Sequence, residues 1–200
     1  MGVQSETLLK PSHLEEAPPR SVVGIWVVPI TPQDEIFVLE NLKAKYESQK
    51  LPGQLNSPAE TYRPNDKGQF LEKTVPRAIS EEIGVLEFQP EDVTPLGLIQ
   101  LPFPDRRVLA APYLLDVPSK SALTFQPKDD QESTNPSWVK LYEVDQRKLK
   151  IGPYEVPLFR SPMQEIVQLI HDRRNGHGFQ VIHSQQPLIP QEVFDQLQGH

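Results

Sequence analysis

Two apolar runs near the start of the chain predict the first pair of strands. Residues 21–30 (SVVGIWVVPI) are rich in β-branched side chains and too short for a buried helix, so they predict a central strand. Residues 31–34 (TPQD) predict a β-turn, because proline occupies the second position. Residues 35–42 (EIFVLENL) then predict a partner strand, and the two runs together predict an antiparallel hairpin.

Further strands are predicted in the second half of the chain. A loop and a strand ending near Gln100 are followed by a proline-marked turn at 101–105 and a returning strand at 106–117. Pro112 interrupts that returning strand, which predicts an edge strand or a bulge. After a polar loop at 118–136, residues 137–144 (SWVKLYEV) predict one more strand.

The C-terminal third predicts an amphipathic helix that packs on the sheet. Ser161 is the expected N-cap and Pro162 the first helical residue, and Asn175-Gly176 is the expected end. A possible short strand (FQVIH) and a last helix at 190–198 follow. The apolar residues of the first helix recur at helical spacing: Met163, Ile166, Val167 and Ile170.

Residues 68–85 predict a short loop, a helix and a glycine stop at Gly84. A proline well inside a helix costs about 3 kcal/mol. Pro76 therefore requires this helix to begin near Thr74 or Val75, which would place the proline in the first turn.

A pair of carboxylates, Glu81 and Glu82, lies near the end of this helix. With about 100° between successive residues, positions 78, 81 and 82 share one face. Such a pair can hold a hard divalent cation, whose ligands are oxygens. The alternative is a solvated face on which Arg77 and Glu81 form an i,i+4 pair, worth about 0.2–0.5 kcal/mol.

Residues 51–85 resemble the Nudix box, G-x5-E-x7-R-E-U-x-E-E-x-G-U, in which U is a bulky aliphatic residue. Leu51-Pro52-Gly53 is similar to the opening that precedes the box, and residues 54–67 make the loop longer than the box has it. The end of the box matches at Arg77, Ile79, Glu81, Glu82, Gly84 and Val85.

The sequence departs from this box at three positions: Gln54 replaces a glycine, Gln69 the loop glutamate and Ala78 the glutamate after the arginine. In the family, the position of Ala78 supplies a metal ligand. An acidic residue of the enlarged loop, Glu60 or Asp66, is a candidate to compensate. The usual partner of Arg77 is at position 69, where Gln69 allows a hydrogen bond at best.

The resemblance implies an α/β (α+β) fold, a Nudix-like α/β/α sandwich with a mixed, largely antiparallel sheet. It covers residues 21–174. We expect residues 1–20, which contain three prolines, to be a flexible N-terminal segment and residues 175–200 to be a C-terminal extension.

The function implied by the resemblance is metal-dependent hydrolysis. Water would attack a pyrophosphate bond in a nucleoside diphosphate linked to another moiety, with Mg²⁺ or Mn²⁺ held by Glu81, Glu82 and the carbonyl of Gly53. Arg77 would hold the helix and the loop together. Glu132 is the first candidate for the catalytic base and Asp130 the second, although both are equally consistent with a solvated acidic loop.

Two other functions remain open at this stage. The changes at Gln69 and Ala78 are consistent with a catalytically weakened Nudix domain that binds a nucleotide-like ligand as a sensor or regulator. The enlarged loop and the two tails are consistent with a partner-binding module.

The composition of the chain limits the kinds of ligand and metal site that we expect. The formal charge of −7 argues against a nucleic acid polymer but not against a small phosphorylated substrate bridged by metal. The chain has 22 prolines, which predicts many irregular segments, and no cysteine, which excludes disulfides and thiolate metal sites. The spacings of His171, His177 and His183 match no metal motif.

No apolar run is long enough to span a membrane and no signal-peptide core is present, so we expect a cytoplasmic protein. Many Nudix proteins dimerise, so the resemblance also allows a homodimer.

Overall fold

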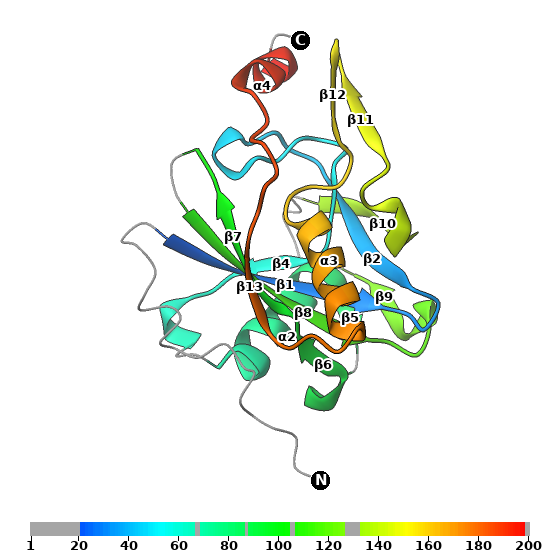
Figure 1. Cartoon of the computed structure of the whole chain (residues 1–200). Helices are drawn as coiled ribbons and strands as arrows, with labels where there is room; N and C mark the ends of the chain where they lie inside the picture. Colours follow the sequence, from blue (N-terminus) through cyan, green and yellow to red (C-terminus); the bar gives the residue numbers. More distant parts are fainter. Residues whose placement is uncertain (1–20, 67–68, 87, 105–106, 127–132, 199–200) are drawn as a thin grey trace.

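A nine-stranded mixed sheet is the centre of the computed structural model (Figure 1). The structure describes residues 21–66, 69–86, 88–104, 107–126 and 133–198, so the predicted flexible segment 1–20 lies outside the described residues. The strand order is β10-β2-β1-β8-β7-β13, with β3, β4 and β6 joined to it at the side. The strands of this sheet are β1 (Ser21–Ile30), β2 (Glu35–Asn41), β3 (Leu55–Asn56), β4 (Ala59–Thr61), β6 (Val93–Pro95), β7 (Gly97–Pro102), β8 (Arg107–Asp116), β10 (Ser133–Lys140) and β13 (Gln180–His183).

The pairing confirms the predicted mixed, largely antiparallel sheet. β1 pairs with β8 in parallel over its whole length, and β13 pairs with β7 in parallel, whereas the other pairs of this sheet are antiparallel. β1 and β2 form the predicted hairpin, but they pair only at Ile30↔Ile36. At the other end of β1, β4 takes the place of β2, with Gly24 opposite Thr61. This exchange brings part of the enlarged loop next to the central strand.

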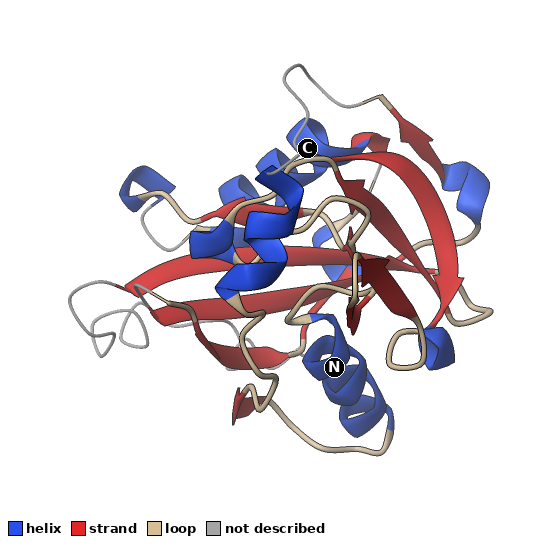
Figure 2. Cartoon of the chain, turned by 90° about the horizontal axis from the view of Figure 1, so that it is seen from above, coloured by secondary structure: helices blue, strands red, loops and turns tan. Residues whose placement is uncertain are grey.

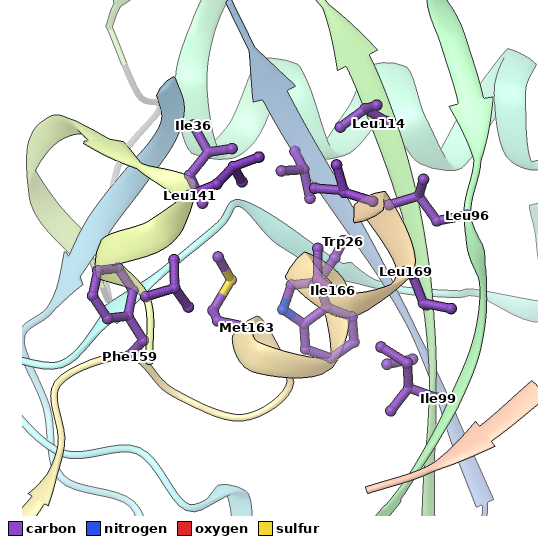
Figure 3. Close-up of a cluster of buried hydrophobic side chains, with 14 of the residues drawn as sticks. Trp26, Ile36, Leu96, Ile99, Leu114, Leu141, Phe159, Met163, Ile166 and Leu169 are labelled. Carbon is purple, nitrogen blue, oxygen red and sulfur yellow. The ribbon is translucent and has the colours of Figure 1, made fainter. Parts of the chain in front are cut away.

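Helices cover both faces of the sheet, as an α/β/α sandwich requires (Figure 2). On one face lies α3 (Met163–Arg174), whose residues Met163, Ile166 and Leu169 point at the sheet around Trp26 (Figure 3). On the other face lies the helical run Phe70–Ile83, which we call the box helix. Its buried residues are Phe70, Thr74, Val75, Ala78, Ile79 and Ile83.

The box helix begins earlier than predicted. A π-helical segment (Phe70–Thr74) precedes the four-residue α2 (Val75–Ala78), and a second π-helical segment (Ile79–Ile83) follows. Pro76 is in the first turn of α2, as expected. A wide π-helical turn precedes it, in which the Val75 N–H donates to the Phe70 carbonyl, so the helix starts before the proline.

Gly84 ends the box helix, as predicted, and β5 (Gly84–Leu86) pairs with β9 (Leu123–Phe125). Its φ of 115° lies in a region that residues with a side chain rarely adopt. A Cβ at this position would also lie 2.6 Å from the backbone of Gln126, whose N–H donates to the Ile83 carbonyl. Glycine is therefore required here for two separate reasons.

A third core cluster joins the C-terminal segment to Leu51, just before the enlarged loop. The hairpin β11 (Lys148–Ile151) and β12 (Tyr154–Pro157), which the sequence pattern did not predict, packs with α4 (Gln191–Gln198) around Leu51. The predicted strand and helix of the C-terminal segment are present as β13 and α4. The aromatic rings of Tyr46 and Phe194 meet edge to face with centroids 5.2 Å apart.

Two local predictions need correction. Pro112 is in the central strand β8 and not in an edge strand, but the predicted bulge is present, because the register shifts by one residue between Pro95↔Tyr113 and Ile99↔Ala110. There Leu96, between β6 and β7, donates its N–H to the Pro112 carbonyl. Pro162, not Ser161, is the N-cap of α3, because the chain first makes a turn in which Met163 N–H donates to Arg160 O.

Among the described residues, no helix combines the length and apolarity that crossing a membrane requires.

Candidate functional site

Arg77 and Asp66 form a two-point ion pair between the box helix and the enlarged loop. Arg77 Nη1 donates to Asp66 Oδ1 over 2.9 Å and Nη2 to Oδ2 over 3.0 Å. Asp66 also accepts from the Thr74 hydroxyl at 2.9 Å and from the Arg63 backbone N–H at 3.2 Å. The bond from Arg77, helped by the other two, lowers the pKa of Asp66 to about 2 from 3.8. The same pair raises the pKa of Arg77.

Asp66 therefore takes the role that the sequence left open at position 69. Gln69 is exposed, and Asp66 supplies the charged partner of Arg77 from within the enlarged loop. Ala78, in contrast, is fully buried in the apolar cluster between the box helix and the sheet. A carboxylate at this position would enter the core, so the family's third ligand has no place here.

Two further carboxylates, Glu60 and Glu81, meet beside this ion pair. Burial first, and then a hydrogen bond and repulsion from the Glu81 carboxyl, raise the pKa of Glu60. Arg63 Nη2 lies 3.3 Å from Glu60 Oε1 and 3.7 Å from Glu81 Oε2, so one guanidinium contacts both acids. Arg77 Nε is 3.6 Å from Glu60 Oε1. Glu60 thus joins the ion pair of the box helix to the Glu81 side chain.

A hollow of about 300 Å³ opens beside Glu60, which is one of its lining residues. Its cationic groups are Lys45, Lys50 and Arg160, and its apolar lining includes Trp26. Reciprocal backbone hydrogen bonds of 2.9 and 3.0 Å join Lys45 and Lys50 and hold the two residues side by side. Arg160 is buried and its Nη2 donates to the Ser48 carbonyl at 2.8 Å. The hollow therefore has three cationic lining residues and one acidic edge, and we call it the cationic hollow.

The other predicted site residues are only partly brought together. Glu82 follows Glu81 and is half-buried. Gly53 contacts other parts of the chain, since its N–H donates to Asn41 O and its α-carbon faces Leu149. Glu132 and Asp130 lie outside the described residues. Within the described ranges, no three His, Asp or Glu side chains are gathered in a metal-binding arrangement.

The chemistry of the Glu60–Glu81 pair nevertheless fits a hard divalent cation. Two carboxyls that share a hydrogen bond in a partly buried site repel one another when both are ionised. A divalent cation relieves that repulsion and is bound through carboxylate oxygens. This pair therefore offers oxygen ligands from two side chains, one of which, Glu60, lies at the edge of the cationic hollow.

Of three comparisons with known proteins, the one with solved structures gives matches. No protein-family model matches the chain, and no curated protein matches it in sequence. Solved structures do match. The Nudix domain of Shewanella oneidensis NrtR, complexed with ADP ribose, is 12% identical with a TM-score of 0.56, over 84% of this chain and 99% of that one. A Nudix hydrolase from Nitrosomonas europaea is 18% identical with a TM-score of 0.53, over 80% of this chain and 93% of that one. The ORF135 protein of E. coli is 14% identical with a TM-score of 0.53, over 78% and 93%. At these identities the comparison shows a shared fold.

Proposed function

We propose that this chain, which has the Nudix fold, is a metal-dependent hydrolase. Its substrate would be a nucleoside diphosphate linked to another moiety, and water would cleave the pyrophosphate bond. The observation that carries this proposal is the position of Glu60, which contacts the carboxyl of Glu81 and lines the cationic hollow. The chain thereby offers a carboxylate from the enlarged loop where Ala78 provides none.

The roles follow from the contacts of each side chain. Glu60, Glu81 and Glu82 would hold Mg²⁺ or Mn²⁺, and the Gly53 carbonyl is a further candidate ligand. When bound, the metal neutralises charge on the pyrophosphate oxygens and orients them. Lys45, together with Lys50 and Arg160, would bind the phosphates in the hollow.

Two residues have other parts in the proposal. Arg77, through Asp66, would keep the loop that carries Glu60 docked on the box helix. Glu132 is the proposed catalytic base.

A second candidate is a domain that binds such a ligand without cleaving it. Arg63 favours this alternative, because its guanidinium lies between Glu60 and Glu81, where a divalent cation would otherwise join them. An internal cation at this point reduces the demand of the two carboxylates for a metal.

The test is an assay of the purified chain with a panel of nucleoside diphosphate compounds, ADP-ribose among them, in Mg²⁺ and in Mn²⁺. The variants Glu60→Gln and Glu82→Gln remove one proposed ligand each while keeping similar size. Glu72→Gln is the matched control, because Glu72 is an exposed glutamate of the same box helix. We expect each ligand variant to lose at least about tenfold in rate, equivalent to about 1.4 kcal/mol in the barrier, and the control to retain its rate.

Each result separates the candidates. Hydrolysis that Glu60→Gln and Glu82→Gln leave unchanged would overturn the proposed site. Saturable binding of a panel compound without turnover, abolished by excess inorganic pyrophosphate, would support the binding domain instead.

A further inference from the structure

A second cavity, of about 370 Å³, lies beside the C-terminal segment and has a different character from the cationic hollow. Four glutamines line it, and we call it the glutamine cavity: Gln49, Gln54, Gln164 and Gln186. Its apolar lining includes Leu101, Phe103 and the fully buried Phe159, and one cationic and one acidic residue, Lys148 and Glu155, line it as well. Its volume falls within the range of roughly 300–1,000 Å³ that is typical of small-molecule sites.

The glutamine cavity is separate from the cationic hollow but shares walls with it. Phe159 lines the cavity and Arg160 lines the hollow. Before the enlarged loop, Gln49 lines the cavity while Ser48 lines the hollow. Consecutive residues of the same two short segments thus line the two spaces.

Two of the four glutamines use both ends of their side-chain amides to hold the walls together. Gln49 accepts from the Ile189 N–H at 2.6 Å and donates to Tyr46 O at 3.0 Å. Gln54 accepts from the Leu51 N–H at 3.0 Å and donates to Pro157 O at 3.1 Å. The Gln49 amide connects the segment before the enlarged loop to the C-terminal segment, and the Gln54 amide connects the start of the enlarged loop to β12.

The other two glutamines are oriented by a buried acid. The carboxyl of Glu165, on α3, accepts a hydrogen bond from the Ser184 hydroxyl and one of 3.0 Å from Gln186 Nε2. Since a carboxylate only accepts hydrogen bonds, this contact fixes which end of the Gln186 amide is nitrogen. Gln186 Nε2 also donates to Gln164 Oε1 at 3.1 Å, which fixes the Gln164 amide in turn.

This network leaves one donor group and one acceptor on two amides that a hydrogen bond already joins. Gln164 Nε2 and Gln186 Oε1 make no hydrogen bond to any described residue. Both belong to residues that line the cavity, together with Phe103, whose side chain is partly exposed. An amide donor and an amide acceptor on two joined side chains, beside an aromatic ring, complement a planar ring that carries an amide of its own.

We infer that the glutamine cavity binds a small uncharged ring with a carboxamide substituent. The ligand carbonyl would accept from Gln164 Nε2, the ligand N–H would donate to Gln186 Oε1, and the ring would lie against Phe103. The inference does not depend on the proposed hydrolysis, because none of its residues is among the proposed metal or phosphate ligands.

The probe for the test is nicotinamide, titrated into the full chain and followed by two-dimensional NMR. Nicotinate is the matched control ligand, because its carboxylate lacks the N–H donor and carries a charge. We expect saturable shifts confined to residues around the cavity, with nicotinamide bound more tightly than nicotinate. Because a typical hydrogen bond contributes about 0.5–1.5 kcal/mol, Gln164→Leu should weaken nicotinamide binding about three- to tenfold.

Gln164→Leu is the decisive variant because it keeps the Gln186–Glu165 bond, whereas Gln186→Leu would leave the buried acid without that donor. Gln168→Leu is the control, since Gln168 is exposed on the same helix and bonds only to Asp172. No saturable shifts with nicotinamide, equal binding of nicotinate, or unchanged binding by Gln164→Leu in a folded protein would each overturn the inference.

Discussion

Asp66 accepts both parallel hydrogen bonds from the guanidinium of Arg77, and this pair joins the enlarged loop to the box helix. Both side chains are largely buried, with 6% of Asp66 and 15% of Arg77 exposed. The same guanidinium donates to the Thr61 carbonyl at 3.0 Å, so it also holds the strand that carries Glu60. Arg77 thus holds both Asp66 and the strand that carries Glu60 against the box helix.

Replacing Asp66 by asparagine should destabilise the protein. The substitution leaves Arg77 largely buried without its anion, and breaking a buried ion pair in this way costs about 3–5 kcal/mol. Urea unfolding followed by circular dichroism measures the loss. The companion variant Gln69→Glu should change the free energy of unfolding by less than about 0.5 kcal/mol, because residue 69 is exposed and Arg77 already has its partner. A large stabilisation by Gln69→Glu would contradict this assignment.

The Asp66 pKa predicts how stability depends on pH. Its value in the folded chain is about 2, below the ordinary 3.8, so between these values the unfolded chain binds more protons at this residue. The stabilisation is complete above about pH 5 and is lost as the pH falls through about 4 towards 2. Urea unfolding between pH 5 and 2 should therefore show a steeper loss for the wild type than for Asp66→Asn. Parallel curves would show that Asp66 is not held in its charged form.

Much of the fold was predictable because its signals are local. The run at 21–30, the turn and the run at 35–42 required only the pattern of apolar residues, and the structure has a strand at each run. The hairpin at 148–157 was missed because each of its strands has only four residues, so the alternation of polar and apolar positions in Lys148–Ile151 is very short.

The candidate site was less predictable because its partners come from distant segments. The sequence indicated Glu60 and Asp66 together as possible replacements for one lost carboxylate. Only the path of the enlarged loop shows that Asp66 binds Arg77 while Glu60 lies beside Glu81. The contribution of Arg160 to the hollow had no local signal, since it depends on a contact with Ser48, 112 residues away.

Restoring the glutamate of the Nudix box by Ala78→Glu should lower the free energy of unfolding rather than improve metal binding. Ala78 is fully buried among apolar side chains, and an unpaired carboxylate there costs several kcal/mol or takes up a proton. We expect a drop in the free energy of unfolding of more than about 3 kcal/mol, measured in urea. Lys73→Glu, at an exposed position of the same helix, is the control. A stable Ala78→Glu protein with tighter Mn²⁺ binding would show that the helix face can turn outward.

The cationic hollow predicts a phosphate contact at Lys45. Lys45 is exposed and lines the hollow, so Lys45→Ala should weaken binding of inorganic pyrophosphate without unfolding the chain. A charged hydrogen bond contributes about 1.5–3 kcal/mol when well formed. Since Lys45 is exposed to solvent, we expect the lower end, about a tenfold rise in Kd by calorimetry. Lys43→Ala, two positions earlier and also exposed, should leave the Kd unchanged. Equal effects of both variants would indicate only a general loss of positive charge.

The contact of Arg63 with Glu60 and Glu81 predicts competition between an internal cation and a metal. Its guanidinium is 55% exposed and lies 3.3 and 3.7 Å from the two carboxylates, so the contribution of each contact is modest. Removing it by Arg63→Ala should leave both carboxylates freer for Mn²⁺ and tighten binding about two- to fivefold, measured by electron paramagnetic resonance titration. Arg63→Lys keeps the charge and should behave closer to the wild type. Weaker Mn²⁺ binding by Arg63→Ala would show instead that the guanidinium holds the two acids in place for the metal.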